Sequence, residues 1–164
     1  ARSEPLWDRG GSGTASAAGG VLSLTAPANG AIFYSRQDSV RTADNAFMSA
    51  TMRMGTNTAG TVPLAGFLLN DDTRVIGVGI SGSQVGFTNG DITAFLSGTT
   101  RSFPTTSTSF DYQLRKFGTD SVQLWVGGAR QLALAYTGFD LDTQTQLPSF
   151  QRFVVRGLGK ARTS

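Results

Sequence analysis

The sequence predicts an all-β domain in which two antiparallel sheets pack face to face, with about ten or eleven strands. Three observations lead to this prediction. Apolar residues alternate with polar ones over short runs, and a period of two is typical of strands with one buried face. Glycine-containing turns separate consecutive runs, as in antiparallel hairpins. No apolar stripe with helical spacing extends beyond about three turns.

The clearest alternation runs from Phe110 to Tyr136, where turn residues at Gly118 and at Gly127-Gly128 separate three apolar runs. We expect a three-stranded meander at the centre of one sheet. The residues expected to face the core are Phe110, Tyr112, Leu114, Val122, Leu124, Val126, Leu132, Leu134 and Tyr136. The same parity places the intervening residues, Trp125 among them, on the outer face.

Shorter runs predict the remaining elements. Residues 1–19 are expected to be irregular, with Trp7 as an apolar anchor. The strands expected before the meander are Val21–Leu24, Ala31–Ser35, Phe47–Met54, Leu64–Leu69, Arg74–Ile80, Gln84–Thr88 and Asp91–Leu96. Asn89-Gly90, between two of these strands, is typical of a two-residue hairpin. Residues 97–109 and 137–149 are expected to be polar loops, and Phe150–Leu158 a last strand.

Length and composition fit one globular domain spanning residues 1–164. The abundant glycine, serine and threonine would suit a disordered chain, but the chain has 11 phenylalanines in strand-sized runs, which favour a packed core. The chain begins at Ala1, so we expect that an initiator or a leader was removed or that the chain was trimmed. No apolar run is long enough for a membrane-spanning helix.

The charge pattern excludes a dedicated nucleic-acid surface. The net charge is only +3, and the arginines are scattered singly along the chain from Arg2 to Arg162. A nucleic-acid-binding protein concentrates its basic residues on one stripe. The absence of cysteine removes disulfides and thiol chemistry and, with them, any signal about the redox compartment.

Four segments resemble the concanavalin A-like lectin/glucanase superfamily, and in particular its bacterial laminin-G-like jelly rolls. They are Trp7 followed by Gly19–Leu24, AFMSATMRM from Ala46, RVIGVGISGSQVGF from Arg74, and FDYQLRKFGTDSVQLWVGG from Phe110. The resemblance covers most of the chain and implies a jelly-roll sandwich whose concave sheet or rim loops bind carbohydrate or calcium. The chain departs from the pattern at Gly127, where the family often has an acidic residue. The tail after Phe153 also lacks the usual closing aromatic strand, so we expect a last strand that is short or shared with a neighbour.

The residues required for hydrolysis are missing from the sequence. Retaining glucanases of the resembled family carry two Glu and one Asp on one strand, whereas Glu4 is the sole glutamate here. Their chemistry needs two carboxyl groups about 5–5.5 Å apart. The close acidic pairs are Asp71 with Asp72, in a turn, and Asp140 with Asp142, in a loop. Histidine and cysteine are absent, which removes the usual base and nucleophile. We therefore expect no enzymatic activity.

Metal binding is limited to calcium by the available ligands. Transition metals prefer histidine or cysteine, and the chain has neither. Calcium takes carboxylate, amide and carbonyl oxygens, for which Asp71, Asp72 and Asp91 in two turns are candidates. The alternative is that these residues simply form turns, where Asp is common. We expect no other cofactor.

Carbohydrate binding is the leading functional hypothesis. An outward Trp125 would offer a flat indole, with Gln123, Gln113, Arg115 and Asp111 beside it to orient sugar hydroxyls. Such a domain would be a recognition or adhesion module outside the cytoplasm, on a cell or virion surface. In the alternative, a loop or another subunit covers Trp125. The domain would then be a self-assembling structural or decoration subunit of a virion, fibre or surface layer, and its partner would be a protein or a copy of itself.

Overall fold

The computed structural model describes residues 7–37, 40–55, 62–141 and 150–156. In this part of the chain there are strands and one three-residue 3-10 helix, η1 (Tyr136–Gly138), but no α-helix. The strands are β1 (Asp8–Gly11), β2 (Thr14–Ala18), β3 (Val21–Thr25), β4 (Ala31–Gln37), β5 (Ala46–Met52), β6 (Ala65–Asn70), β7 (Arg74–Ile80), β8 (Gln84–Thr88), β9 (Phe95–Ser102), β10 (Phe110–Phe117), β11 (Ser121–Val126), β12 (Ala129–Ala135), β13 (Asp140–Leu141) and β14 (Phe150–Arg156). The predicted all-β sandwich is confirmed.

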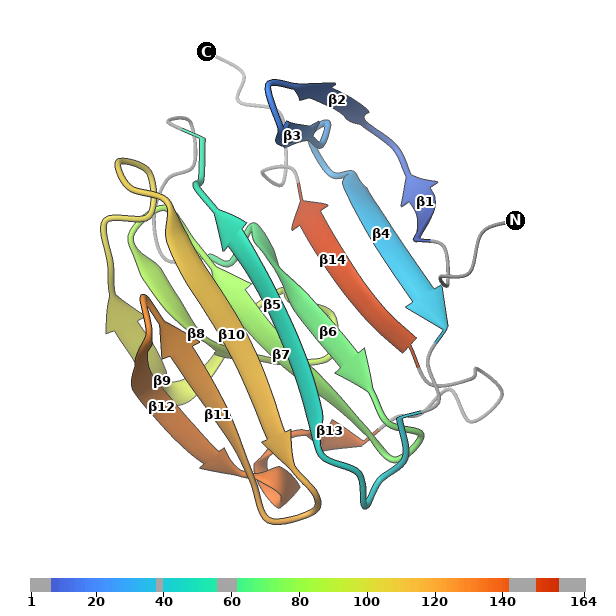
Figure 1. Cartoon of the computed structure of the whole chain (residues 1–164), viewed down its shortest axis with the longest axis vertical. Coiled ribbons are helices and arrows are strands. Elements are labelled where there is room, and N and C mark those ends of the chain that lie inside the picture. The colour runs from blue at the N-terminus through green and yellow to red at the C-terminus, as the bar shows by residue number, and fades with distance from the viewer. Residues whose placement is uncertain (1–6, 38–39, 56–61, 142–149, 157–164) are drawn as a thin grey trace.

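The strands form two packed antiparallel sheets and one separate hairpin (Figure 1). The large sheet has the order β1-β4-β14-β6-β7-β8-β9, with β13 paired to β7. The small sheet has the order β12-β11-β10-β5, and within the described residues β2 pairs with β3 alone. In Figure 1 the small sheet lies in front of β6 to β9, while β4 and β14 extend beside it. The core lies between the two sheets.

The predicted meander is present as β10, β11 and β12. Its inward residues Tyr112, Leu114, Val122 and Leu124 are fully buried, at 0% exposure. The side chains between them, such as Gln113 and Trp125, are partly exposed. The alternation therefore separated the two faces of this ribbon correctly. The pairing of β11 with β12 is interrupted by a register shift between Leu124 and Trp125.

The N-terminal segment differs from the prediction because part of it is strand. β1 pairs along its whole length with β4, from Asp8 opposite Ser35 to Gly11 opposite Ile32. These bonds come from the backbone, so an edge strand of polar and glycine residues forms without an apolar alternation. Trp7 does anchor this segment as predicted, since its ring lies 5.0 Å from that of Phe153.

The connection after β8 is longer than the hairpin predicted from Asn89-Gly90. Strand β9 begins at Phe95, and the backbone N–H of Asn89 bonds to the carbonyl of Ala94 at 3.1 Å. The Asn89 side chain organises the loop by accepting the backbone N–H of Thr93 at 2.9 Å. Ile92 adopts a positive φ of 53° and is fully buried with Leu68 and Val154 on the outer face of the large sheet. Tertiary burial of this one side chain therefore outweighs the local hairpin preference.

The last strand also differs from the prediction. β14 lies inside the large sheet and pairs with β4 on one side and β6 on the other. It is therefore neither short nor shared with a neighbouring molecule. Part of the predicted loop 97–109 is strand as well, because β9 continues to Ser102. Residues 142–149, in the predicted loop before β14, lie outside the described residues.

A buried ion pair connects the two sheets at one end of the sandwich. Lys116 follows the inward parity of Tyr112 and Leu114, so its side chain enters the core. Its ammonium lies 3.3 Å from the Asp71 carboxylate, and both side chains have 0% exposure. Lys116 also donates to the backbone carbonyls of Thr42 at 2.7 Å and Asp44 at 2.8 Å.

The Asp71 carboxylate is fully engaged. One oxygen, Oδ1, accepts the backbone N–H groups of Thr73 at 3.1 Å and Arg74 at 2.9 Å. The other, Oδ2, accepts the Tyr136 hydroxyl at 2.7 Å. Four contacts from β10, the β6–β7 turn, the first residue of β7 and η1 thus compensate one buried negative charge.

Replacing Lys116 by Met should lower the free energy of unfolding by about 3–5 kcal/mol, since it leaves the Asp71 charge buried without its cation. Urea denaturation measures this change. The double variant Lys116→Met/Asp71→Asn should recover part of the loss, because the uncompensated charge is then absent. A loss below about 1 kcal/mol in the single variant would contradict the assigned role.

Stability should also fall in alkaline solution because two tyrosines are buried in their neutral form. Burial raises the pKa of Tyr112 to about 12. Burial, and then the hydrogen bond to Asp71, raises the pKa of Tyr136 above its ordinary value. A raised pKa in the folded state stabilises below the unfolded value, about 10, and this contribution is lost as pH rises toward the folded value.

We expect the free energy of unfolding to be level up to about pH 10 and to decrease between about pH 10 and 12. Urea titrations at successive pH values, with tyrosinate absorbance at 295 nm, measure both effects. The variant Tyr112→Phe should show a shallower decrease. An unchanged slope in that variant would show that Tyr112 does not contribute.

Candidate functional site

The five residues predicted to bind a ligand lie together on the outer face of the small sheet. Strand pairing sets their positions: Gln113 is opposite Trp125, and Arg115 is opposite Gln123. Asp111 precedes them on the same face of β10. Side chains that are directly opposite in an antiparallel pair share a face. We call this set, together with Phe47, the outer platform.

Phe47 joins the platform from β5, where it is opposite Arg115. Its side chain is 54% exposed, which is unusual for a large aromatic residue. The alternation around Met48 indicates that Phe47 faces outward. The sequence does not show that β5 pairs with β10, and for this reason Phe47 was absent from the predicted site.

Two separate sets of hydrogen bonds fix the polar side chains of the platform. The indole N–H of Trp125 donates to Gln123 Oε1 at 2.9 Å. Arg115 donates from Nε at 3.2 Å and from Nη2 at 2.6 Å to Gln113 Oε1. Gln113 in turn donates from Nε2 to Asp111 Oδ2 at 2.9 Å. The amide orientation of Gln113 is therefore set by a cation on one side and a carboxylate on the other.

Arg115 covers the ring of Trp125. Its guanidinium carbon lies 4.0 Å from the centre of the indole and 6.0 Å from the centre of the Phe47 ring. A cation at this distance is attracted to the negative face of the aromatic system. A ligand that approaches the platform therefore meets a stacked guanidinium and indole, whereas the sequence predicted a bare indole.

The candidate calcium ligands do not come together. Asp71 is the buried partner of Lys116, and Asp91 is an exposed residue of the loop after β8. Asp72 is exposed and donates its backbone N–H to the side chain of Asn70 at 2.8 Å. Among the described residues, no group of three or more acidic, histidine or cysteine side chains is arranged to hold a metal ion. Asp142 of the other acidic pair lies outside the described residues.

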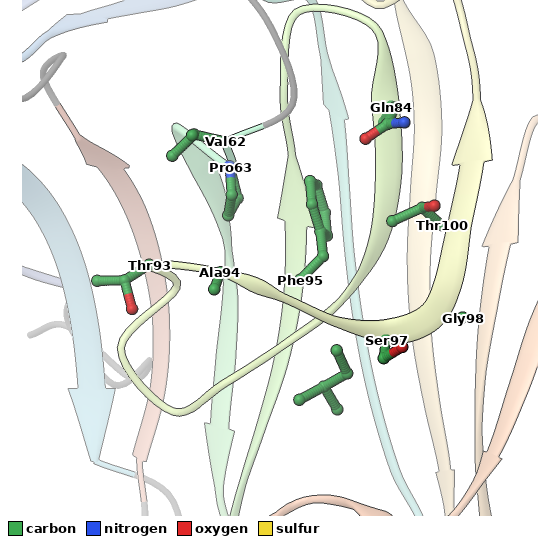
Figure 2. Close-up of a pocket in the computed structure, with 10 residues that line it drawn as sticks. Val62, Pro63, Gln84, Thr93, Ala94, Phe95, Ser97, Gly98 and Thr100 are labelled. Atoms are coloured by element: carbon green, nitrogen blue, oxygen red, sulfur yellow. The ribbon is translucent and has the colours of Figure 1, made fainter.

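The large sheet carries a shallow groove of about 380 Å³ that sequence reasoning did not find. Its lining includes the apolar residues Pro63, Phe95 and Leu96 and the polar residues Gln84 and Thr100. Figure 2 shows the ring of Phe95 between Pro63 on one side and Gln84 and Thr100 on the other. The groove is thus built from the segment before β6 and from β8 and β9.

Glycines make this groove possible. A Cβ atom at Gly79 would lie 2.7 Å from Pro63 Cβ and 3.2 Å from the Phe95 ring. A Cβ at Gly86 would lie 3.0 Å from the same ring. The ring of Phe95 therefore rests directly on the backbone of β7 and β8. The sequence shows Gly79 in GVG and Gly86 in VGF, but it does not show that the ring of Phe95 packs on them.

No protein-family model and no curated protein sequence matches the chain. Solved structures do share its fold. A Crh5 transglycosylase without ligand matches with a TM-score of 0.52 and 17% identity, over 81% of this chain and 55% of the other. A Crh5 transglycosylase in complex with NAG gives 0.51 and 17%, over 80% and 56%. An endo-1,3-β-glucanase from Streptomyces sioyaensis gives 0.47 and 14%, over 79% and 59%.

The likeness to the two transglycosylase structures establishes the fold, a jelly-roll-like β-sandwich. The chain spans about 55% of the length of the transglycosylase. No helix in the described residues is both long and apolar enough to cross a membrane.

The expectation that the chain has no enzymatic activity was wrong. It rested on the missing residues of a few known hydrolytic arrangements. The transglycosylase that shares this fold is an enzyme, so a sandwich of this kind is compatible with catalysis. One fold supports many chemistries, and the absence of a particular carboxylate pair does not exclude the others.

Proposed function

We propose that this domain binds carbohydrate through the outer platform of the small sheet. The observation that carries the proposal is the Arg115–Trp125 stack, which lies on an outward face and is flanked by fixed amide groups. A sugar ring has apolar C–H surfaces and equatorial hydroxyls. Planar side chains can stack on the former, and Gln113 and Gln123 can bond to the latter.

The platform is a better candidate than the groove on the large sheet. Each platform side chain except Phe47 has a hydrogen bond to a neighbour at 3.2 Å or less, so these binding groups are ordered before a ligand arrives. The groove is mainly apolar and open, and its polar lining residues Gln84, Thr93, Ser97 and Thr100 lie apart around it (Figure 2). The fold supports the proposal, since a related sandwich was solved in complex with NAG.

The proposal has two further parts. On the four quoted segments, we place the chain among the laminin-G-like jelly rolls of the superfamily. We also propose that the protein functions outside the cytoplasm, on a cell or virion surface, where glycans are available for binding.

Truncating Trp125 to Ala should reduce glycan binding at least tenfold, because it removes the ring on which the Arg115 guanidinium stacks and so disrupts the surface that a sugar meets, worth roughly 1.5 kcal/mol or more. The melting temperature should change little, since the indole lies outside the core. A glycan array followed by titration calorimetry measures binding, and product analysis of the same mixtures measures turnover.

The groove supplies the matched control. Phe95→Ala removes an aromatic ring from the other sheet and should leave binding unchanged. Loss of binding in Phe95→Ala but not in Trp125→Ala would move the site to the groove. Unfolding of Trp125→Ala would show that the indole is structural.

Self-assembly is a second candidate function, favoured by the β2–β3 hairpin. This hairpin pairs with no other strand among the described residues, and Val21 and Leu22 are 63% and 53% exposed. An isolated two-stranded hairpin is marginally stable in water. No charged residue occurs from Gly10 to Ser35, so two basic chains can meet there without repulsion between like charges.

If the hairpin joins copies of the chain, Leu22→Lys should convert an oligomer to a monomer in light-scattering measurements, since edge charges block strand pairing. Thermal stability of the monomer should stay within about 0.5 kcal/mol, because this side chain is exposed. Leu141→Lys, at another exposed leucine, is the control and should not change the mass. A monomeric parent chain would contradict this candidate.

A further inference from the structure

The positive charge of Arg115 has no negative partner among the described residues. Its recorded contacts are the neutral oxygen of Gln113 and the rings of Trp125 and Phe47. Among the described residues, the side-chain ion pair in the structure joins Lys116 to Asp71 in the core, and Arg115 takes no part in it. Arg115 is therefore a partly buried cation that is fixed in place but not neutralised.

The orientation of the guanidinium leaves one edge open. Its Nε and Nη2 atoms donate to the single oxygen of Gln113, and Trp125 lies against its plane. Nη1 makes no recorded hydrogen bond in the described residues. The edge formed by Nη1 and Nη2 can donate two hydrogen bonds to an oxyanion, in the geometry that arginine forms with carboxylates and phosphates.

The surrounding charges favour an anion. Arg130 is exposed and opposite Trp125 on β12, so it lies on the same face. The one carboxylate on this face of the four strands is Asp111, and it already accepts a hydrogen bond from Gln113. The face therefore carries more positive than negative charge.

We infer that the ligand of the outer platform is an acidic glycan whose carboxylate or sulfate group binds at Arg115. This inference rests on the proposed function, and it adds the chemical class of the sugar. Trp125 supports the guanidinium from below, the edge of Arg115 pairs with the anionic group, and Arg130 contributes long-range attraction. Uronate and sulfate share the required oxyanion chemistry.

The test compares three probes by titration calorimetry: a uronic acid oligosaccharide, a sulfated oligosaccharide and a neutral glucan oligosaccharide. At least one acidic probe should bind more tightly than the neutral one, and its affinity should fall as salt is added. Arg115→Gln should weaken acidic binding roughly ten- to a hundredfold, as expected for a lost hydrogen-bonded charge. Whichever acidic probe binds identifies the anionic group.

Two further variants separate recognition from general attraction. Arg101→Gln removes the same charge from β9 on the large sheet and should leave acidic binding unchanged. Arg115→Lys keeps the charge but loses the planar fork and should recover only part of the affinity. Circular dichroism of each variant verifies that the fold is intact.

The outcomes that overturn the inference are distinct from those that overturn the proposed function. Equal binding of neutral and acidic probes, dependent on Trp125, would reject the acidic ligand and keep the glycan site. If Arg101→Gln and Arg115→Gln weaken the binding of the acidic probe equally, the attraction comes from the net charge of the protein. This result would reject a site at Arg115. No binding of any probe, acidic or neutral, would reject both.

Discussion

The buried contact between Lys116 and Asp71 is the constraint on which the sandwich depends most. It joins β10 of the small sheet to the β6–β7 turn of the large one, at 3.3 Å and without solvent exposure. Tyr136 bonds to the same carboxylate from η1. A buried charge is costly unless it is both paired and hydrogen-bonded. This requirement fixes where the end of the meander lies relative to the opposite sheet.

The same strand that supplies Lys116 to the core supplies the platform to the surface. On β10, Tyr112 and Leu114 point inward while Gln113 and Arg115 point outward. A strand held in register by an ion pair cannot slip by one residue, since a slip would exchange its two faces. The rigidity of the core therefore keeps the arginine over Trp125, which an edge loop could not do as reliably.

The two faces of the sandwich are built by opposite means. On the small sheet, long polar side chains bond to one another and stand above the strands. On the large sheet, glycines leave the backbone bare, and Ile92 and Phe95 pack directly on it. Hydrogen bonding determines the arrangement on the small sheet, whereas the space left by the glycines determines the arrangement on the large sheet. A fold shared with a transglycosylase is thus compatible with binding surfaces of different chemistry on its two sides.

The sequence by itself determined the fold class and the inward and outward faces of the meander, because alternation with a period of two is a local property. It also named the residues that gather around Trp125. It could not determine that β14 lies between β4 and β6, or that Phe47 meets Arg115, since these pairings join distant segments. Only the tertiary structure decided that Lys116 meets Asp71 in the core and that Arg115 covers the indole. Both depend on partners from other strands and turns, whose positions no local pattern encodes.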